Sequence, residues 1–183
     1  MASRLPAVLS HLDLPEAELW AAHLDGEVYP LDECFSPIDE AELPGNRVRA
    51  LGLILPRRTI AERLSAAWLH GVLPFPPAVH QLCADSRARV KPVRSRRFQV
   101  REVEITAEEI VACEGVQITT PLRTVMDLAR FSDRFGPDER RLVRGLLALQ
   151  GIGVEECCSA ILARRNLPAK RLALRRVRAC FED

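Results

Sequence analysis

The sequence predicts an α+β fold in three successive parts: an N-terminal helix with a hairpin, a small mixed β-sheet core with helices, and a C-terminal helical layer. Three observations support this prediction. Apolar residues recur at helical spacing near both ends of the 183-residue chain. The middle of the chain instead contains short β-like runs separated by polar or glycine-containing turns. A chain of this length buries about 70% of its unfolded surface, so its core needs no disulfide or metal.

The N-terminal part is predicted to be a helix followed by a hairpin. Pro15 is a favourable first helical residue, and Asp25 with Gly26 provides a stop. Two short strands with prolines at their margins follow. A winged helix ends in this way, so we expect a shortened, remnant winged-helix-like segment at residues 1–44. An α+β domain with C-terminal helices is then expected at residues 45–183.

The central part combines helices with short strands. One helix is expected over residues 44–56, which prolines bracket, and another through Ala66–Leu69 with its stop at Gly71. A sheet of about four strands should follow, because β-like runs alternate with turns. These runs are residues 78–83, 97–105, 109–112 and 116–119.

Four helices are predicted for the last third of the chain. They cover residues 121–131, 137–150, 154–165 and 168–181. The first of these helices follows Thr120, a good N-cap, and begins at Pro121, whose ring suits the first helical turn. The strand that ends at Thr119 is therefore expected to pass directly into a helix.

Arg123 and Asp127 lie four residues apart within that helix. On an exposed helix such a pair contributes only a few tenths of a kcal/mol. If the pair is half-buried, Arg123 can bind backbone carbonyls of the neighbouring sheet while Asp127 holds the guanidinium in place. We favour this structural clamp over a catalytic role, because the pair has no accompanying acid, base or nucleophile.

The sequence contains no pattern typical of an enzyme or a metal site. It lacks the G-x-S-x-G and Walker motifs, and neither lysine lies two residues after an acidic residue, as a restriction-type nuclease would need. His80 and Cys83, three apart on a predicted strand, point to opposite faces, and the adjacent Cys157 and Cys158 chelate one ion poorly. We therefore predict a non-enzymatic protein with no catalytic residues, no metal and no cofactor. Its six cysteines are expected to be buried free thiols.

The net charge of +1 conceals a strong asymmetry. Residues 1–46 contain ten acidic residues and one arginine, a balance of −9. Residues 87–101 contain seven basic residues and no acidic residue, and residues 164–178 contain another seven. Such clusters can bind phosphates, although runs of charge are more often solvated surface. The DNA-binding candidates from the two basic stretches are Arg87, Arg89, Lys91, Arg94, Arg96, Arg97, Arg101, Arg171, Arg175 and Arg178.

The chain is expected to be cytoplasmic and not to enter a membrane. Its first twenty residues lack the continuous apolar stretch of a signal peptide, and acidic residues occur where such a peptide would still be apolar. No apolar run approaches the roughly eighteen residues that cross a bilayer.

Three segments carry a family resemblance: LPEAELWAAHLDGEVYPLDECFSP, RTIAERLSAAWLHGV and GVQITTPLRTVMDLAR. Their order and spacing resemble the AbiEi family of type IV antitoxins and related actinobacterial transcriptional regulators, over most of residues 12–131. The resemblance implies a winged helix-turn-helix that binds operator DNA, followed by an α+β antitoxin domain. It also implies a regulator that represses its own operon and counteracts a nucleotidyltransferase-like toxin, so DNA and such a toxin are the implied partners.

The matching positions mark the scaffold of the implied domain and are not a catalytic set. They are Ser65, Ala66, Ala67, Trp68, His70, Gly71, Thr120, Pro121, Arg123, Asp127 and Leu128. Two alternatives stay open. Only fourteen residues precede Pro15, and the first 46 residues are acidic, which favours a protein-interaction module that has lost DNA binding. Some relatives continue into a restriction-endonuclease-like domain, so an accessory fragment related to such proteins is the second alternative.

Overall fold

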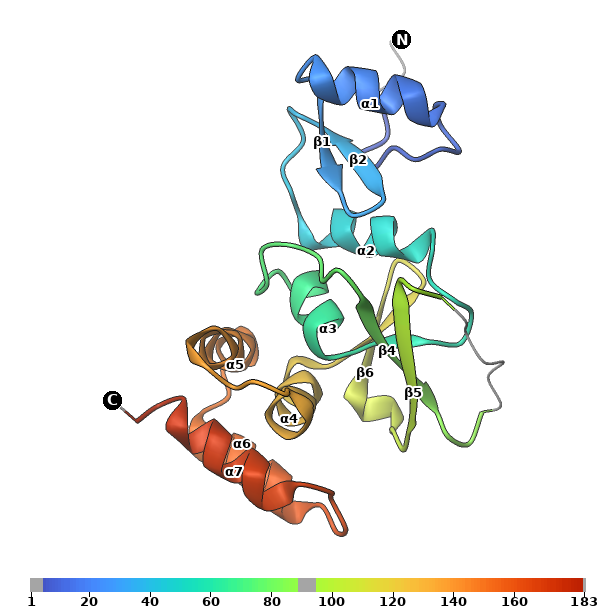
Figure 1. Ribbon diagram of the computed structural model, residues 1–183. Coiled ribbons are helices and arrows are strands. Elements are labelled where there is room, and N and C mark those ends of the chain that lie inside the picture. Colours follow the sequence, from blue (N-terminus) through green and yellow to red (C-terminus); the bar gives the residue numbers. More distant parts are fainter. Residues whose placement is uncertain (1–4, 89–94, 183) are drawn as a thin grey trace. The chain divides into compact units, whose positions relative to one another are not determined.

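The computed structural model describes residues 5–88 and 95–182. Over these residues it contains seven α-helices, a two-stranded hairpin and a five-stranded mixed sheet, which confirms the predicted α+β class (Figure 1). The chain divides into two compact units. The N-terminal unit extends to Arg57 and includes Cys113–Val116, and the larger unit contains Arg58–Ala112 and the chain from Gln117 onward.

The N-terminal unit is a helix and a hairpin followed by a second helix. Its elements are α1 (Glu16–Leu24), β1 (Val28–Leu31), β2 (Cys34–Pro37) and α2 (Pro44–Gly52). The segment before α1 adds an antiparallel bridge, in which the backbone N–H groups of Leu9 and Phe35 donate to each other's carbonyls at 2.7 and 2.8 Å. Leu9, Phe35, Leu19 and Val28 form a small separate apolar cluster. The hairpin and α1 agree with the sequence pattern, and α2 ends at Gly52, before the predicted end at residue 56.

The larger unit contains a sheet with the strand order β5-β4-β3-β7-β6. Its strands are β3 (Ile60–Ala61), β4 (His80–Asp85), β5 (Phe98–Val103), β6 (Ile110–Cys113) and β7 (Val116–Thr119). Four of these strands were predicted, and β3 is the addition. Although it has only two residues, β3 pairs antiparallel with β4 and parallel with β7 and so joins the two halves of the sheet. Two residues are too few to produce an alternating pattern in the sequence.

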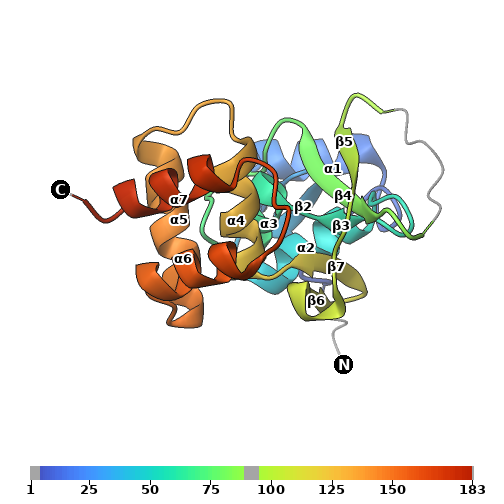
Figure 2. The same ribbon diagram turned by 90° about the horizontal axis from the view of Figure 1, so that it is seen from below.

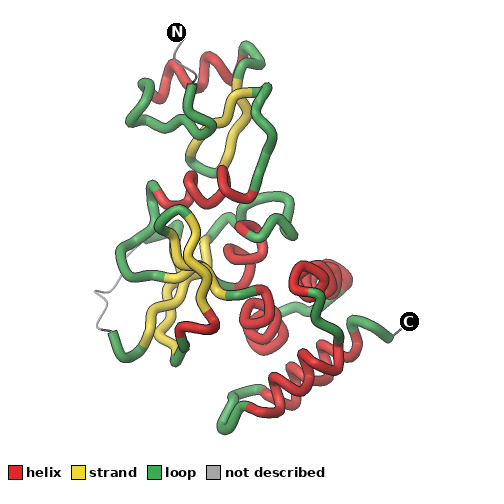
Figure 3. Tube along the Cα trace, turned by 180° about the vertical axis from the view of Figure 1, so that it is seen from behind, coloured by secondary structure: helices red, strands yellow, loops and turns green. Residues whose placement is uncertain are grey.

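The helices of the larger unit gather on one side of this sheet, as the views in Figures 1 and 2 show. They are α3 (Arg63–Leu69), α4 (Pro121–Phe131), α5 (Pro137–Gln150), α6 (Val154–Ala163) and α7 (Lys170–Ala179). α3 and α4 lie nearest the strands, and α5 to α7 lie beyond them. Figure 3 shows the same division from behind, with the strands in yellow and the helices in red.

The main apolar core lies among these helices. Val125, Leu128, Leu146 and Ile161 are among its fully buried members, so α4, α5 and α6 all contribute to one cluster. The last two helices are shorter than the sequence pattern predicts. Asn166 in the connecting loop and Ala169, the N-cap residue of α7, have left-handed backbone conformations with φ of 53° and 56°, which interrupt the helical path.

Over the described ranges, no single helix is long and apolar enough to cross a membrane. α5 and α6 reach that length and composition only when taken together, and they meet at a bend of 92°.

Candidate functional site

The basic ribbon of residues 87–101 is only partly described, since Arg89, Lys91 and Arg94 lie outside the described residues. Arg87 is exposed and binds the neighbouring Asp85 carboxylate through two N–H groups at 2.9 and 3.1 Å. Arg96 is exposed and Arg97 is half-buried. The Nη1 group of Arg97 donates to the carbonyl of Ala78 at 3.1 Å. In the described part of the ribbon, Arg87 and Arg97 therefore already donate some of their N–H groups to neighbouring protein oxygens.

Arg101 has a different environment from the rest of the ribbon. Its guanidinium points inward and binds the Glu62 carboxylate with Nε–Oε1 and Nη2–Oε2 distances of 2.6 and 2.5 Å. Nη2 also lies 3.1 Å from Oδ2 of Asp127. The guanidinium carbon is 4.2 Å from the ring centroid of Phe131. These contacts use most of the Arg101 donors inside the protein.

The outer face of α7 carries the other predicted basic residues. Arg171, Arg175 and Arg178 are exposed, while Ala173 and Val177 bury the opposite face of the helix. A stripe spaced at i, i+4 and i+7 lies along one side of a helix. The structure thus brings these three arginines together on one surface of the larger unit.

The centre of the larger unit is a buried ion network, which we define by three carboxylates and five arginines: Glu62, Glu109, Asp127, Arg63, Arg101, Arg123, Arg130 and Arg164. Asp127 and Glu62 are completely buried. Asp127 accepts from Arg123 Nε at 2.8 Å and from Arg130 Nη1 at 3.0 Å, in addition to its contact with Arg101. One carboxylate therefore holds three guanidinium groups from β5 and α4.

Glu109 extends the network to the end of α6. Its Oε2 atom accepts from Arg123 Nη1 at 2.7 Å and from the backbone N–H of Thr106 at 3.1 Å. Its Oε1 atom accepts from Arg164 Nη2. Arg123 Nη1 also lies 3.3 Å from the carbonyl oxygen of Glu104. The raised pKa of Arg123 results from Asp127 and Glu109, whose charges and hydrogen bonds outweigh the lowering effect of burial.

The start of α4 explains how the sequence places Arg123 in this network. Thr120 Oγ1 accepts from the backbone N–H of Arg123 at 3.3 Å, and Pro121 occupies the first turn. The hydroxyls of Thr119 and Thr124 lie 2.7 Å apart, which links the end of β7 to the helix. His70, at the end of α3, donates Nε2–H to the carbonyl of Thr119 at 2.8 Å. The helix is thus fixed to both neighbouring elements at its first turn.

Ser65 and Trp68 lie in the interior and not at a surface site. Ser65 Oγ is 3.1 Å from His80 Nδ1 and accepts from the backbone N–H of Gln81 at 2.8 Å. The Trp68 and His80 rings lie 5.8 Å apart. Ser65, Trp68 and His80 have no exposed surface. The Ser65–His80 pair has no route to a substrate, so it joins α3 to β4. Gly71 follows in the left-handed conformation with φ of 81°, as helix termination requires.

A groove of about 610 Å³ lies over the ion network. We call it the arginine groove, and its basic and aromatic lining residues are Arg101, Arg123, Arg130, Phe131, Arg164 and Arg165. Arg130 lies 4.3 Å from the centroid of Phe131, so two guanidinium groups contact this ring. Burial lowers the pKa of Arg130, and the charges of Arg123, Arg101 and Arg164 lower it further against the opposing effect of Asp127.

Sequence reasoning identified the Arg123–Asp127 pair but missed most of its surroundings. Glu109 follows Thr106 by three residues, which is the spacing of a capping box, and this signal could have marked it. Glu62 and Arg130 carry no comparable signal. Their role depends on the sheet order, which brings β3, β5 and α4 together.

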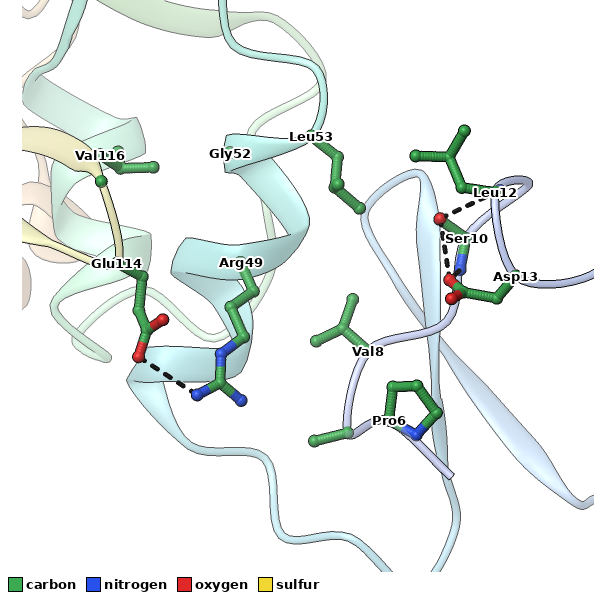
Figure 4. A pocket seen from close by; sticks show the side chains of 12 residues that line it. Pro6, Val8, Ser10, Leu12, Asp13, Arg49, Gly52, Leu53, Glu114 and Val116 are labelled. Atoms are coloured by element: carbon green, nitrogen blue, oxygen red, sulfur yellow. Dashed lines mark hydrogen bonds and ion pairs between the residues drawn. The ribbon is translucent and has the colours of Figure 1, made fainter. Parts of the chain in front are cut away.

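A second hollow, of about 630 Å³, belongs to the N-terminal unit (Figure 4). Pro6, Val8 and Leu53 give it apolar walls. Arg49 and Glu114 form an ion pair at one side, with Nη2 and Oε1 3.1 Å apart. Ser10 and Asp13 add polar groups to its lining, and the Ser10 hydroxyl donates to Oδ2 of Asp13 at 3.0 Å.

Comparison with protein families gives a match to the AbiEi antitoxin C-terminal domain over residues 60–146. This part of the chain is similar to the AbiEi antitoxin C-terminal domain. The predicted family resemblance is confirmed for this part of the chain. The matched region contains every residue of the ion network except Arg164. It also contains the positions on which the resemblance was based, among them Ser65, Trp68, His70, Gly71, Thr120, Pro121, Arg123 and Asp127.

The chain also has a structural match: "Crystal structure of RV2827C protein from Mycobacterium tuberculosis". The identity is 16%, the match covers 96% of this chain and 75% of that chain, and the TM-score is 0.47. No curated protein matches the sequence. The AbiEi antitoxin domain belongs to a toxin–antitoxin family that is typically non-enzymatic, and an antitoxin of this family implies a cognate toxin.

Proposed function

We propose that the chain is a non-enzymatic, antitoxin-type regulator that binds DNA through phosphate contacts and counteracts a nucleotidyltransferase-like toxin. The observation that carries the DNA contact is the exposed stripe of Arg171, Arg175 and Arg178 on α7. Within the described part of the chain, these arginines have no ion-pair partner. Three guanidinium groups along about 10 Å of helix can bind successive phosphate oxygens without reading bases.

The basic ribbon is a second place for phosphate contacts in this proposal. Arg96 is exposed, and Arg87 keeps N–H donors beyond those bound to Asp85 and to the Ile105 carbonyl. Arg89, Lys91 and Arg94 stay candidates from the sequence. We assign Arg101 to the ion network instead, because its guanidinium is held by Glu62 and Asp127.

A salt-dependent gel shift with the DNA upstream of the gene tests this function. The variant carries Arg171→Gln, Arg175→Gln and Arg178→Gln, and Arg141→Gln on α5 is the control because Arg141 is exposed but already paired with Asp138. Log affinity should fall linearly with log salt concentration, with a slope about 0.9 shallower for each phosphate contact removed. An equal slope for the wild type and the triple variant would remove α7 from the interface. Arg94, Arg96 and Arg97 changed to alanine test the ribbon in the same way.

A specific observation favours a second function for the N-terminal unit, namely binding of the partner protein. Leu12 and Leu24 are 73% and 84% exposed, and Trp20 is 48% exposed, on a segment with a balance of −9 over residues 1–46. Exposed apolar residues within a charged surround mark interaction surfaces. The acidic surround favours a partner with a basic surface. This function stands even if the chain does not bind DNA.

Co-purification with the product of the neighbouring gene tests the partner function. Leu24→Glu and Leu12→Glu should each reduce recovery of the partner, because a charge then occupies the apolar contact. Leu162→Glu is the matched control, since Leu162 is 54% exposed but lies on α6 of the larger unit. Equal recovery with all three variants would exclude the N-terminal unit as the binding surface.

A further inference from the structure

The arginine groove brings together cationic groups from three separate parts of the larger unit. Arg101 comes from β5, Arg123 and Arg130 from α4, and Arg164 and Arg165 from the end of α6 and the loop after it. No sequence pattern places these five residues together. Their convergence on one concave surface depends on the fold.

Several of these arginines keep hydrogen-bond donors after their internal contacts are counted. A guanidinium has five N–H donors. Arg130 uses one toward Asp127 and one toward the carbonyl of Pro168 at 2.9 Å, and Arg164 uses one toward Glu109. Arg165 is exposed and has no ion-pair partner among the described residues. The groove therefore offers fixed guanidinium groups with unused donors.

The carboxylates near the groove do not neutralise the guanidinium groups at its floor. Glu62, Glu109 and Asp127 are buried and already accept from the network arginines. The free acidic side chains are Glu102 and Glu104, which line the groove and are exposed. Burial lowers the pKa of Arg130 most, and repulsion by the neighbouring arginines lowers it further. An anion placed among these guanidinium groups would relieve that repulsion.

We propose that the arginine groove binds a small ligand that carries a phosphate group, such as inorganic pyrophosphate or a nucleotide. Its volume of about 610 Å³ lies within the range of roughly 300–1,000 Å³ that is typical of small-molecule sites. Guanidinium groups bind phosphate oxygens through paired N–H donors, and buried pairs fix their direction. The ion network acts here as the rigid support that orients Arg130 and Arg164 toward the ligand.

The depth of the groove favours a small ligand over a nucleic-acid backbone. The side chains of Arg123 and Arg130 are only 4% and 7% exposed. A duplex backbone meets a protein at protruding side chains, such as the arginines of α7, whereas a recessed guanidinium reaches only a ligand that enters the groove. This site is therefore independent of the DNA contact proposed for α7.

Isothermal titration calorimetry at a fixed ionic strength near 0.15 M tests the site with pyrophosphate, ATP and adenosine. Pyrophosphate and ATP should bind, and adenosine, which has no phosphate, should not. Arg165→Gln should weaken binding at least about tenfold, because it removes a charge-assisted contact. Arg130→Gln should do the same, with its melting temperature measured alongside because Arg130 also holds Asp127.

Arg175→Gln is the matched control, since Arg175 is also exposed but lies on α7 outside the groove. Its affinity for pyrophosphate should equal that of the wild type. An equal loss of affinity for pyrophosphate in Arg175→Gln and Arg165→Gln would show diffuse charge attraction and overturn the proposed site. The absence of pyrophosphate and ATP binding, or binding of an oligonucleotide alone, would overturn it as well. Arg165 is exposed and is not part of the ion network. Arg165→Gln should therefore fold normally, and a loss of binding in this variant would not result from a folding defect.

Discussion

Oδ2 of Asp127 lies 2.8 Å from Nε of Arg123, and neither residue has more than 3% of its surface exposed. On an exposed helix, the order of this pair would make it a weak contact. Here Asp127 also binds Arg101 and Arg130, and Arg123 also binds Glu109. The pair is thus the centre of a connected network, in which each buried charge depends on the others for compensation.

Asp127→Asn should destabilise the protein strongly. The substitution removes the negative charge that three guanidinium groups share. Arg101 and Arg123 keep Glu62 and Glu109 as partners, whereas the mostly buried Arg130 is left with no carboxylate among the described residues. Loss of one partner of a buried pair costs about 3–5 kcal/mol, which corresponds to a fall in melting temperature of roughly 6–20 °C for a chain of this size. Thermal and urea unfolding measure both quantities.

Asp138→Asn provides the comparison for that measurement. Asp138 pairs with Arg141 on the surface of α5, and both side chains are more than 70% exposed. Because solvent screens such pairs, Asp138→Asn should lower the free energy of unfolding by less than about 1 kcal/mol. This figure includes the loss of an acidic residue at the helix N-terminus. Similar losses for the two substitutions would contradict the central role of Asp127.

Local signals in the sequence predicted most of the fold but only part of the site. Thr120, Pro121 and the apolar spacing after them define α4 through contacts within one helical turn, so its bounds of 121–131 could be predicted. Glu62 is different, because it becomes a network carboxylate only when Arg101 approaches from β5. A contact between residues 39 positions apart has no local pattern. Its prediction would need the strand order in advance.

His70 should make stability depend on pH. Burial lowers its pKa, and the hydrogen bond from Nε2 to the Thr119 carbonyl opposes this only in part. The unfolded chain therefore binds the proton at higher pH, near 6.5, than the folded protein does. The stabilising contribution of His70 is present above about pH 6.5 and is lost as the pH falls toward the lower folded-state pKa. Urea unfolding at pH 7.5 and pH 5.5 measures the change.

His70→Gln separates this effect from other titrating groups. The glutamine side chain can still donate an N–H to the Thr119 carbonyl, but it does not titrate. The loss of unfolding free energy between pH 7.5 and pH 5.5 should be smaller in the variant than in the wild type. Equal losses would mean that His70 does not contribute to the pH dependence.

Cys113 should be the fastest-reacting of the six cysteines. It is half-buried, while the other five are buried. Burial raises the pKa of Cys34 to about 11, with further contributions from Asp32, Glu33 and Asp13, and burial raises that of Cys157 to about 12. Because the thiolate is the reactive form, these buried groups should react slowly.

An aromatic disulfide reagent added to the native protein can test this ranking. We expect a fast phase of one thiol, followed by a slow phase that speeds up in denaturant. Cys113→Ser should remove the fast phase and leave the slow phase unchanged. A fast phase that survives this substitution would show that another cysteine is accessible in the native state.

An alanine substitution at Gly145 on α5 should raise or lower the free energy of unfolding, depending on the side chain at Val72. A Cβ atom at Gly145 would lie 2.7 Å from Cγ1 of Val72, which is too close for either side chain. The resulting overpacking costs about 1–3 kcal/mol and should outweigh the gain of roughly 0.5–1 kcal/mol from replacing glycine inside a helix. Gly145→Ala should therefore destabilise the wild type. In a Val72→Ala background the clashing atom is absent, so the same substitution should stabilise the protein.

A double-mutant cycle measured by urea unfolding gives both effects and their coupling energy. Val72→Ala alone will lower stability, because Val72 packs against the main core, and the cycle subtracts this loss. The coupling should favour the double variant by about 1–3 kcal/mol, which is the cost of the clash that Val72→Ala removes. The gain in helix propensity is the same in both backgrounds and cancels in the cycle. If Gly145→Ala changes the free energy of unfolding in the same direction in both backgrounds, the cost depends on backbone adjustment of α5 and not on the Val72 side chain.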